Sequence, residues 1–148
     1  MSKTRTKAPP VVSVVTLGCK LNQADSETIA RQLAGEGVQV VDRAVKGADA
    51  FVINTCSVTH VADRKARHAV RLARRLSPNA QVVLTGCYAE TAPADIAFVT
   101  GADFVARNAD KPLIPERILE KLRATGDPAA GCGAPESAGR TRAFVKIQ

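Results

Sequence analysis

Short apolar segments alternate with amphipathic segments along most of the chain. Five apolar segments are only four to seven residues long and are bounded by turn-forming or polar residues, which is typical of strands. The predicted strands are Val11–Leu17, Val38–Val41, Ala50–Asn54, Gln81–Thr85 and Asp103–Ala106.

Between these strands the apolar residues change to helical spacing. Ile29 and Leu33 lie one turn apart, and the longest segment repeats apolar residues at intervals of three and four, which gathers them on one helix face. Asp25 or Ser26 can cap the first helix, with Glu27 in its first turn. The predicted helices are Ser26–Gly35, Val61–Leu76, a short one around Pro93–Val99, and about Ile114–Ala124.

Strands that alternate with helices through short connections imply right-handed βαβ units and an open parallel sheet. We therefore expect an α/β domain with an open, mostly parallel sheet of about five strands and helices on both faces. The expected arrangement is flavodoxin-like, with the strand order 2-1-3-4-5.

The predicted domain covers residues 11–124 and follows a basic tail, residues 1–10. Residues 125–142 are rich in Gly, Ala, Pro and Ser without a hydrophobic period, which predicts a linker. Residues 143–148 (RAFVKIQ from position 142) then begin a strand that has nothing left in this sequence to pair with. We interpret them as the first strand of a truncated second domain, and the chain as a fragment.

Composition adds an expectation about the compartment. With 148 residues, 45% of them hydrophobic, the chain can build one core. No segment approaches the roughly 18 apolar residues of a membrane helix, and the N-terminus lacks the apolar stretch of a secretory signal. We expect a cytoplasmic protein without membrane contact, where cysteines more often serve metals or catalysis than disulfides. Oligomeric state is not readable from the sequence.

Three of the four cysteines follow predicted strands: Cys19 the first, Cys56 the third and Cys87 the fourth, each in a short turn. In an open α/β sheet, ligands collect outside the carboxyl ends of the strands. Strands one, three and four are neighbours in the expected order, so these turns lie within roughly 10 Å. Gly18 and Gly86, each directly before a cysteine, allow tight turns or a close approach to a bulky inorganic group.

Three thiolates at one edge predict a metal site. Structural zinc normally takes four ligands and iron–sulfur clusters usually take four cysteines, so three leave one metal position open for an exchangeable ligand. His60 is a less favoured candidate for a fourth ligand. Each cysteine could instead be a small buried hydrophobe, which three at one edge disfavour. Cys132, in the linker, is interpreted as an incidental exposed thiol.

Three blocks around these cysteines resemble the N-terminal domain of the radical S-adenosylmethionine methylthiotransferases. They are TLGCKLNQADSE (residues 16–27), VINTCSVTHVADRKAR (52–67) and LTGCYAE (84–90), and the resemblance spans residues 11–147. It implies that Cys19, Cys56 and Cys87 bind an auxiliary [4Fe–4S] cluster. It also implies a second [4Fe–4S] cluster and S-adenosylmethionine in a following domain, whose CxxxCxxC motif does not occur in this sequence.

The resemblance implies a function for the longer enzyme. A 5′-deoxyadenosyl radical made by the radical domain would abstract hydrogen from C2 of an adenine, and the auxiliary cluster would deliver a methylated sulfur to it. Blocks two and three look most like the branch acting on N6-threonylcarbamoyladenosine at position 37 of tRNA. The isopentenyladenosine and ribosomal-protein branches remain alternatives, and Lys20 and Leu21 fit neither. Alone, the fragment should be inactive.

Further residues carry expectations beside these ligands. Asn22 and Asn54, from the same blocks, could hydrogen-bond near the cluster, or simply serve turn and strand-end hydrogen bonds. A net charge of +7 and a basic helix face suggest phosphate contacts with tRNA, although a solvated helix face explains them too. The candidate contacts are Arg64, Arg67, Arg71, Arg74 and Arg75, with His68 among them.

A competing interpretation is a flavodoxin-like module that binds a nucleotide or a protein partner at the same edge, with incidental cysteines. It is disfavoured because the first strand is followed by GCKLNQ, which has a single glycine where a GxGxxG phosphate loop would stand. A third interpretation is an accessory domain that binds RNA through phosphates alone.

Overall fold

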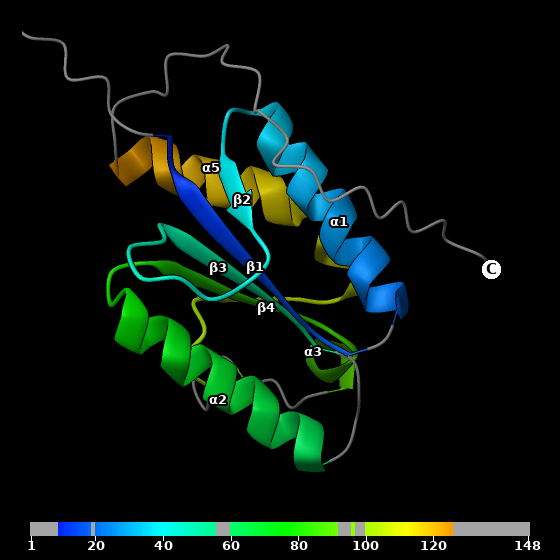
Figure 1. Ribbon diagram of the computed structural model, residues 1–148. Helices are drawn as coiled ribbons and strands as arrows, with labels where there is room; N and C mark the ends of the chain where they lie inside the picture. The colour runs from blue at the N-terminus through cyan, green and yellow to red at the C-terminus, as the bar shows by residue number, and fades with distance from the viewer. Residues whose placement is uncertain (1–8, 19, 56–59, 92–95, 97–99, 126–148) are drawn as a thin grey trace, which may run out of the picture.

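The structure, a computed structural model, describes residues 9–18, 20–55, 60–91, 96 and 100–125. Its centre is a sheet of five parallel strands in the order β2-β1-β3-β4-β5 (Figure 1). The strands are β1 (Val11–Leu17), β2 (Gln39–Val41), β3 (Ala50–Thr55), β4 (Gln81–Gly86) and β5 (Phe104–Ala106). The expected α/β class and the expected strand order are confirmed.

Helices cover both faces of the sheet. Helices α1 and α5 lie on one face and α2 lies on the other, as Figure 1 shows. The helical elements are α1 (Lys20–Gly35), α2 (His60–Leu76), α3 (Cys87–Thr91), the 3-10 helix η1 (Asn108–Leu113) and α5 (Ile114–Thr125). No helix in the described ranges is long and apolar enough to cross a membrane.

The central strands are apolar on both faces because both faces are covered. Every residue of β3 is buried. Phe51 and Ile53 join the apolar cluster of Val70 from α2, whereas Val52 joins the cluster of Ile118 from α5 on the opposite face. This continuous apolar pattern is typical of a buried parallel strand, and it holds the carboxyl ends of β1, β3 and β4 at one rim.

The start of the first helix corrects the sequence prediction. Helix α1 begins at Lys20, six residues before the expected start, so neither Asp25 nor Ser26 caps it. Ser26 is instead buried inside the helix, where its hydroxyl accepts hydrogen bonds from Thr16 Oγ1 (2.8 Å) and Asn54 Nδ2 (3.0 Å). Two strands therefore use the hydroxyl that a cap would have needed.

Other boundaries differ less. Helix α2 begins at His60, one residue early, and α3 begins at Cys87 in place of the expected short turn. The short helix expected around residues 93–99 falls almost entirely outside the described residues, as do the tail, the linker and the final strand.

Candidate functional site

The ends of three neighbouring strands form a rim in common register. In the middle strand β3, Thr55 pairs with Leu17 of β1 on one side and with Gly86 of β4 on the other. The next residue after Thr55 is Cys56 and the next after Gly86 is Cys87, while Cys19 comes two residues after Leu17. Since neighbouring strands are about 4.8 Å apart, the strand ends Leu17, Thr55 and Gly86, which precede the three cysteines in the sequence, lie at one level within about 10 Å.

Of the three predicted ligands, only Cys87 lies in the described part of the chain. It is the first residue of α3, partly buried and not in a disulfide. Its carbonyl oxygen accepts a hydrogen bond of 3.1 Å from Thr91 Oγ1, which closes the first turn of α3. The described residues contain no group of three or more His, Cys, Asp and Glu side chains that could hold a metal. Ligation by three cysteines stays a prediction.

Gly86 brings the backbone of β4 unusually close to that of β3. Its φ angle is +100°, and a Cβ atom there would lie 2.0 Å from the Thr55 carbonyl oxygen and 2.6 Å from the Thr55 nitrogen. Gly18, before Cys19, also has a positive φ, of 153°. The close approach at Gly86 is to the neighbouring strand, and it brings together the strand ends that precede Cys56 and Cys87. A close approach to an inorganic group, expected from the sequence, is not tested and stays a prediction.

Two buried asparagines join α1 to the end of β3. The Asn22 side-chain nitrogen donates to the Thr55 carbonyl oxygen (2.7 Å) and to Asn54 Oδ1 (3.4 Å). In return, Asn54 Nδ2 donates to the Asn22 carbonyl oxygen (2.9 Å) and to Ser26 Oγ. Asn22 is 3% exposed and Asn54 is fully buried, so these bonds are made out of water.

This asparagine pair fixes the spacing of two cysteine-bearing segments. Asn22 lies three residues after Cys19, and Asn54 lies two residues before Cys56. Strand-end hydrogen bonding, one of the two roles expected from the sequence, is therefore confirmed. Hydrogen bonding toward a bound cluster is not tested and stays a prediction.

An acid, a base and a phenol connect α2 to α3. Arg67 donates from Nε and from a terminal nitrogen to the two carboxylate oxygens of Asp63, each at 2.9 Å, and the Tyr88 hydroxyl donates to the same carboxylate. Asp63 lies in the first turn of α2, and Tyr88 directly follows Cys87. This cluster, Asp63–Arg67–Tyr88, therefore ties the helix after Cys56 to the turn that carries Cys87.

The Asp63–Arg67–Tyr88 cluster shifts the pKa values of Asp63 and Tyr88 in opposite directions. The hydrogen bond from Tyr88, helped by Arg67, holds the pKa of the Asp63 carboxyl below its ordinary value of 3.8 against a smaller effect of burial. Burial raises the pKa of Tyr88, and the hydrogen bond to Asp63 raises it further. At neutral pH a carboxylate, a guanidinium and a neutral phenol therefore stand together.

The lowered pKa of Asp63 makes part of the stability depend on pH. Because the folded-state pKa lies below the unfolded value, the contribution of Asp63 is complete above about pH 4 and is lost as the pH falls through the folded pKa. We expect the difference in unfolding free energy between the protein and Asp63→Asn to shrink from about pH 6 to about pH 2. Urea denaturation across that range measures it. Glu27→Gln, which removes a carboxylate that is 32% exposed and lies 3.8 Å from Arg31, is the control, and a difference independent of pH would contradict the assignment.

The arginines of α2 divide into two groups. The guanidinium of Arg67 is held by Asp63, and that of Arg74 binds Asp103 (2.8 Å) and the carbonyl oxygens of Ala80 and Gly101. Their expected role as phosphate contacts conflicts with these internal bonds, which already use the donors. Three other candidates, Arg64, Arg71 and Arg75, are exposed.

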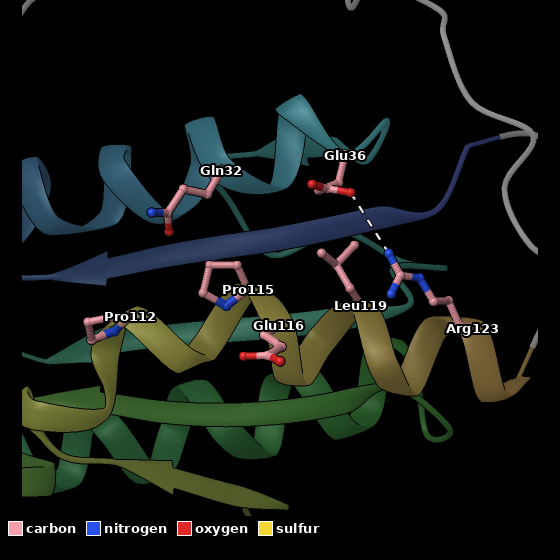
Figure 2. A pocket seen from close by; sticks show the side chains of 7 residues that line it. All are labelled: Gln32, Glu36, Pro112, Pro115, Glu116, Leu119 and Arg123. Atoms are coloured by element: carbon pink, nitrogen blue, oxygen red, sulfur yellow. Dashed lines mark ion pairs between the residues drawn. The ribbon is translucent and has the colours of Figure 1, made fainter.

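A shallow groove lies on the opposite face of the sheet, between α1 and α5 (Figure 2). Its volume is about 320 Å³, and its walls carry the Glu36–Arg123 ion pair at 3.9 Å. No cysteine lines it, so it is separate from the rim. Its lining residues are Gln32, Glu36, Pro112, Pro115, Glu116, Leu119 and Arg123.

The fold and the rim define a doubly wound, parallel α/β domain in which three strands that each precede a cysteine in the sequence end at one edge of the sheet. The profile of uncharacterized protein family UPF0004 matches residues 11–106, and the chain belongs to that family. The match covers β1 to β5 and all three predicted ligands.

Curated relatives of this chain are methylthiotransferases. The threonylcarbamoyladenosine tRNA methylthiotransferase MtaB of Bacillus subtilis is 35% identical over 93% of this chain and 33% of its own length. The protein of the same name from Aquifex aeolicus is 41% identical over 75% of this chain and 27% of its own length. The resemblance noted in the sequence is thus confirmed, and the chain spans about a third of the length of these relatives.

A solved structure shares the fold alone. The monomethylamine corrinoid protein of Methanosarcina barkeri superposes with a TM-score of 0.54 over 81% of this chain and 61% of that chain. At 17% sequence identity this similarity supports the architecture and carries nothing about ligands.

Proposed function

We propose that this chain is the N-terminal domain of a tRNA methylthiotransferase that adds a methylthio group to C2 of N6-threonylcarbamoyladenosine at position 37 of tRNA. In this proposal Cys19, Cys56 and Cys87 bind an auxiliary [4Fe–4S] cluster. The observation that carries the proposal is the common register of Leu17, Thr55 and Gly86, from which three cysteine-bearing segments leave one rim. The printed names of both relatives support the choice of nucleoside and of tRNA as partner.

The residues at the rim suit a cluster rather than a closed zinc site. Thiolates are soft ligands that favour iron–sulfur clusters, and three of them leave one metal position open. Cys87 is only partly buried and is not in a disulfide, so its thiol is not consumed by another bond. Because Gly86 has no side chain, β4 can approach β3 closely at the residue before Cys87. When bound, the cluster would supply the sulfur that becomes the methylthio group.

This chain's own residues would hold the ligands in place. The Asn22–Asn54 pair sets the separation of the segments that carry Cys19 and Cys56. The Asp63–Arg67–Tyr88 cluster sets the position of the Cys87 turn relative to α2. The second cluster, S-adenosylmethionine and hydrogen abstraction would belong to the radical domain in the remainder of the longer protein. As a tRNA-modifying enzyme, that protein would act in the cytoplasm.

Anaerobic reconstitution tests the cluster directly. We expect about four irons and four sulfides per chain, with the broad visible absorption of an iron–sulfur protein. Cys19→Ser, Cys56→Ser and Cys87→Ser should each lose most of the iron, because the loss of one of three thiolates leaves two protein ligands. Cys132→Ser is the matched control and should retain the full content. A colourless domain holding stoichiometric zinc would refute the assignment.

The identity of the modified nucleoside is tested with the longer protein. We expect mass spectrometry of tRNA from a strain lacking the gene to show N6-threonylcarbamoyladenosine without its methylthio group. Expression of the intact protein should restore the group, and expression of a Cys87→Ser protein should not. Loss of methylthio from isopentenyladenosine, or from a ribosomal protein, would assign the enzyme to another branch.

A further inference from the structure

One face of α2 presents a line of arginine and histidine side chains to solvent. Arg64, His68, Arg71 and Arg75 are all exposed, and they recur at intervals of four, three and four residues. At 100° per residue these intervals place them within a narrow arc of the helix, opposite the buried residues Ala66, Val70 and Ala73. We call Arg64, His68, Arg71 and Arg75 the α2 stripe. It extends over about 16 Å.

Internal ion pairs distinguish the other arginines of the helix from those of the stripe. Arg67 and Arg74 lie beside it, but their guanidinium groups are bound to Asp63 and Asp103. Asp63 is the only acidic residue in α2 and is already paired. Among the residues that the structure describes, no salt bridge reaches Arg64, Arg71 or Arg75.

On the other face of the molecule, two exposed arginines lie near carboxylates and a third lies over an aromatic ring. On α1, Arg31 lies 3.8 Å from Glu27, and Arg123 of α5 lies 3.9 Å from Glu36 of α1. Arg117 of α5 lies over the ring of Phe104, 5.2 Å from its centroid. Net positive charge is therefore concentrated on the α2 side, where it creates a local attraction for anions.

The stripe also starts close to the rim. Helix α2 begins four residues after Cys56, and its first turn lies near α3 at the carboxyl ends of the strands (Figure 1). From there α2 runs back along the sheet, away from the rim. A polyanion that occupied the stripe would therefore have one end beside the rim formed by the ends of β1, β3 and β4.

We propose that the α2 stripe binds the phosphate backbone of an RNA whose reacting nucleotide lies at the rim. The inference rests on the proposed function for the identity of the RNA, a tRNA. Arginine suits this role because its planar guanidinium can donate two hydrogen bonds to one phosphate. Contacts of this kind hold the RNA in place without reading its bases, which agrees with a protein having only 3% aromatic residues for stacking.

Charge-matched variants of the 148-residue chain test the stripe. In one variant Arg64, Arg71 and Arg75 are changed to Gln; in the control, Arg31, Arg117 and Arg123 are changed to Gln. Both variants lower the net charge from +7 to +4, since three positive charges are removed. Fluorescence anisotropy with an unmodified tRNA transcript, between about 50 and 200 mM salt, measures binding. Thermal melting confirms that each variant is folded.

We expect the stripe variant to bind at least about tenfold more weakly and to reduce the slope of log K against log salt by about two to three. The control should change binding less than about twofold. Equal weakening in both variants, or no change in the stripe variant, would overturn the proposal. Equally tight binding of poly-glutamate would also overturn it and point to an acidic protein partner. The assay uses cluster-free protein, so its result is independent of the iron and sulfide analysis that tests the cluster.

Discussion

The Gly86→Ala variant is expected to lose about 3–5 kcal/mol of unfolding free energy, enough to leave much of a marginally stable domain unfolded. Two effects add. A φ of +100° costs an L-residue about 1–2 kcal/mol, and a Cβ atom 2.0 Å from the Thr55 carbonyl oxygen forces two backbones apart. The neighbouring atom is backbone in a fully buried strand, so it cannot rotate away as a flexible side chain would.

Gly37→Ala is a matched control for the cost of placing an L-residue at a positive φ angle. Gly37 lies in the turn after α1 with a φ of +82°, and nothing lies within 4 Å of its Cβ position. It should therefore lose only the backbone part, about 1–2 kcal/mol. Urea denaturation of both variants then isolates the steric cost at Gly86 as the difference. Equal losses at the two positions would show that β4 does not approach β3 as closely as the structure has it.

The order of strands and helices could be predicted because burial on both faces of the sheet requires a recognisable pattern of apolar residues in the sequence. Strands β3 and β4 are continuous apolar runs, and α2 repeats Ala66, Val70 and Ala73 on one side. Right-handed connections then leave few strand orders to consider. The rim followed from the same topology, since the cysteines come directly after strands whose order was already determined.

The start of α1 could not be predicted because its first turn reverses the usual pattern. Leu21 is 52% exposed while Asn22 is 3% exposed, so the apolar residue faces solvent and the polar one faces the sheet. Hydrophobic periodicity misses a turn of this kind. Only the hydrogen bonds from Asn22 and Asn54, which join positions 32 residues apart, explain why the amide is buried.

Only part of the Asp63–Arg67–Tyr88 cluster could be predicted from the sequence. Asp63 and Arg67 are four residues apart on a predicted helix, a spacing that favours an ion pair, yet Arg67 was assigned to the RNA-binding face. Tyr88 lies 25 residues after Asp63, just beyond the end of β4, and no local sequence pattern connects the two residues. Side-chain partners across elements depend on packing, which spacing alone does not provide.

Asn54→Asp is expected to lose about 3–5 kcal/mol at neutral pH, although it changes one NH2 group to oxygen and creates no cavity. Asn54 Nδ2 donates to the Asn22 carbonyl oxygen and to Ser26 Oγ, so the substituted oxygen would face the Asn22 carbonyl oxygen without a hydrogen to share. The carboxylate would also be fully buried, with no cation among its hydrogen-bond partners. Burial would raise its folded-state pKa above the unfolded value of about 3.9.

The sign of the pH effect follows from that raised pKa. Below the unfolded pKa both states are protonated and the penalty for the charge is absent; as the pH rises, only the unfolded state ionises freely, so the variant loses stability. Urea denaturation should therefore show the deficit of Asn54→Asp relative to the unmodified protein growing from about pH 4 to about pH 7. Asn79→Asp makes the same chemical change in an exposed turn and should stay within about 0.5 kcal/mol throughout. If the two deficits run parallel with pH, the amide of Asn54 does not hold α1 against β3, and the spacing between the Cys19 and Cys56 segments must be set by other contacts.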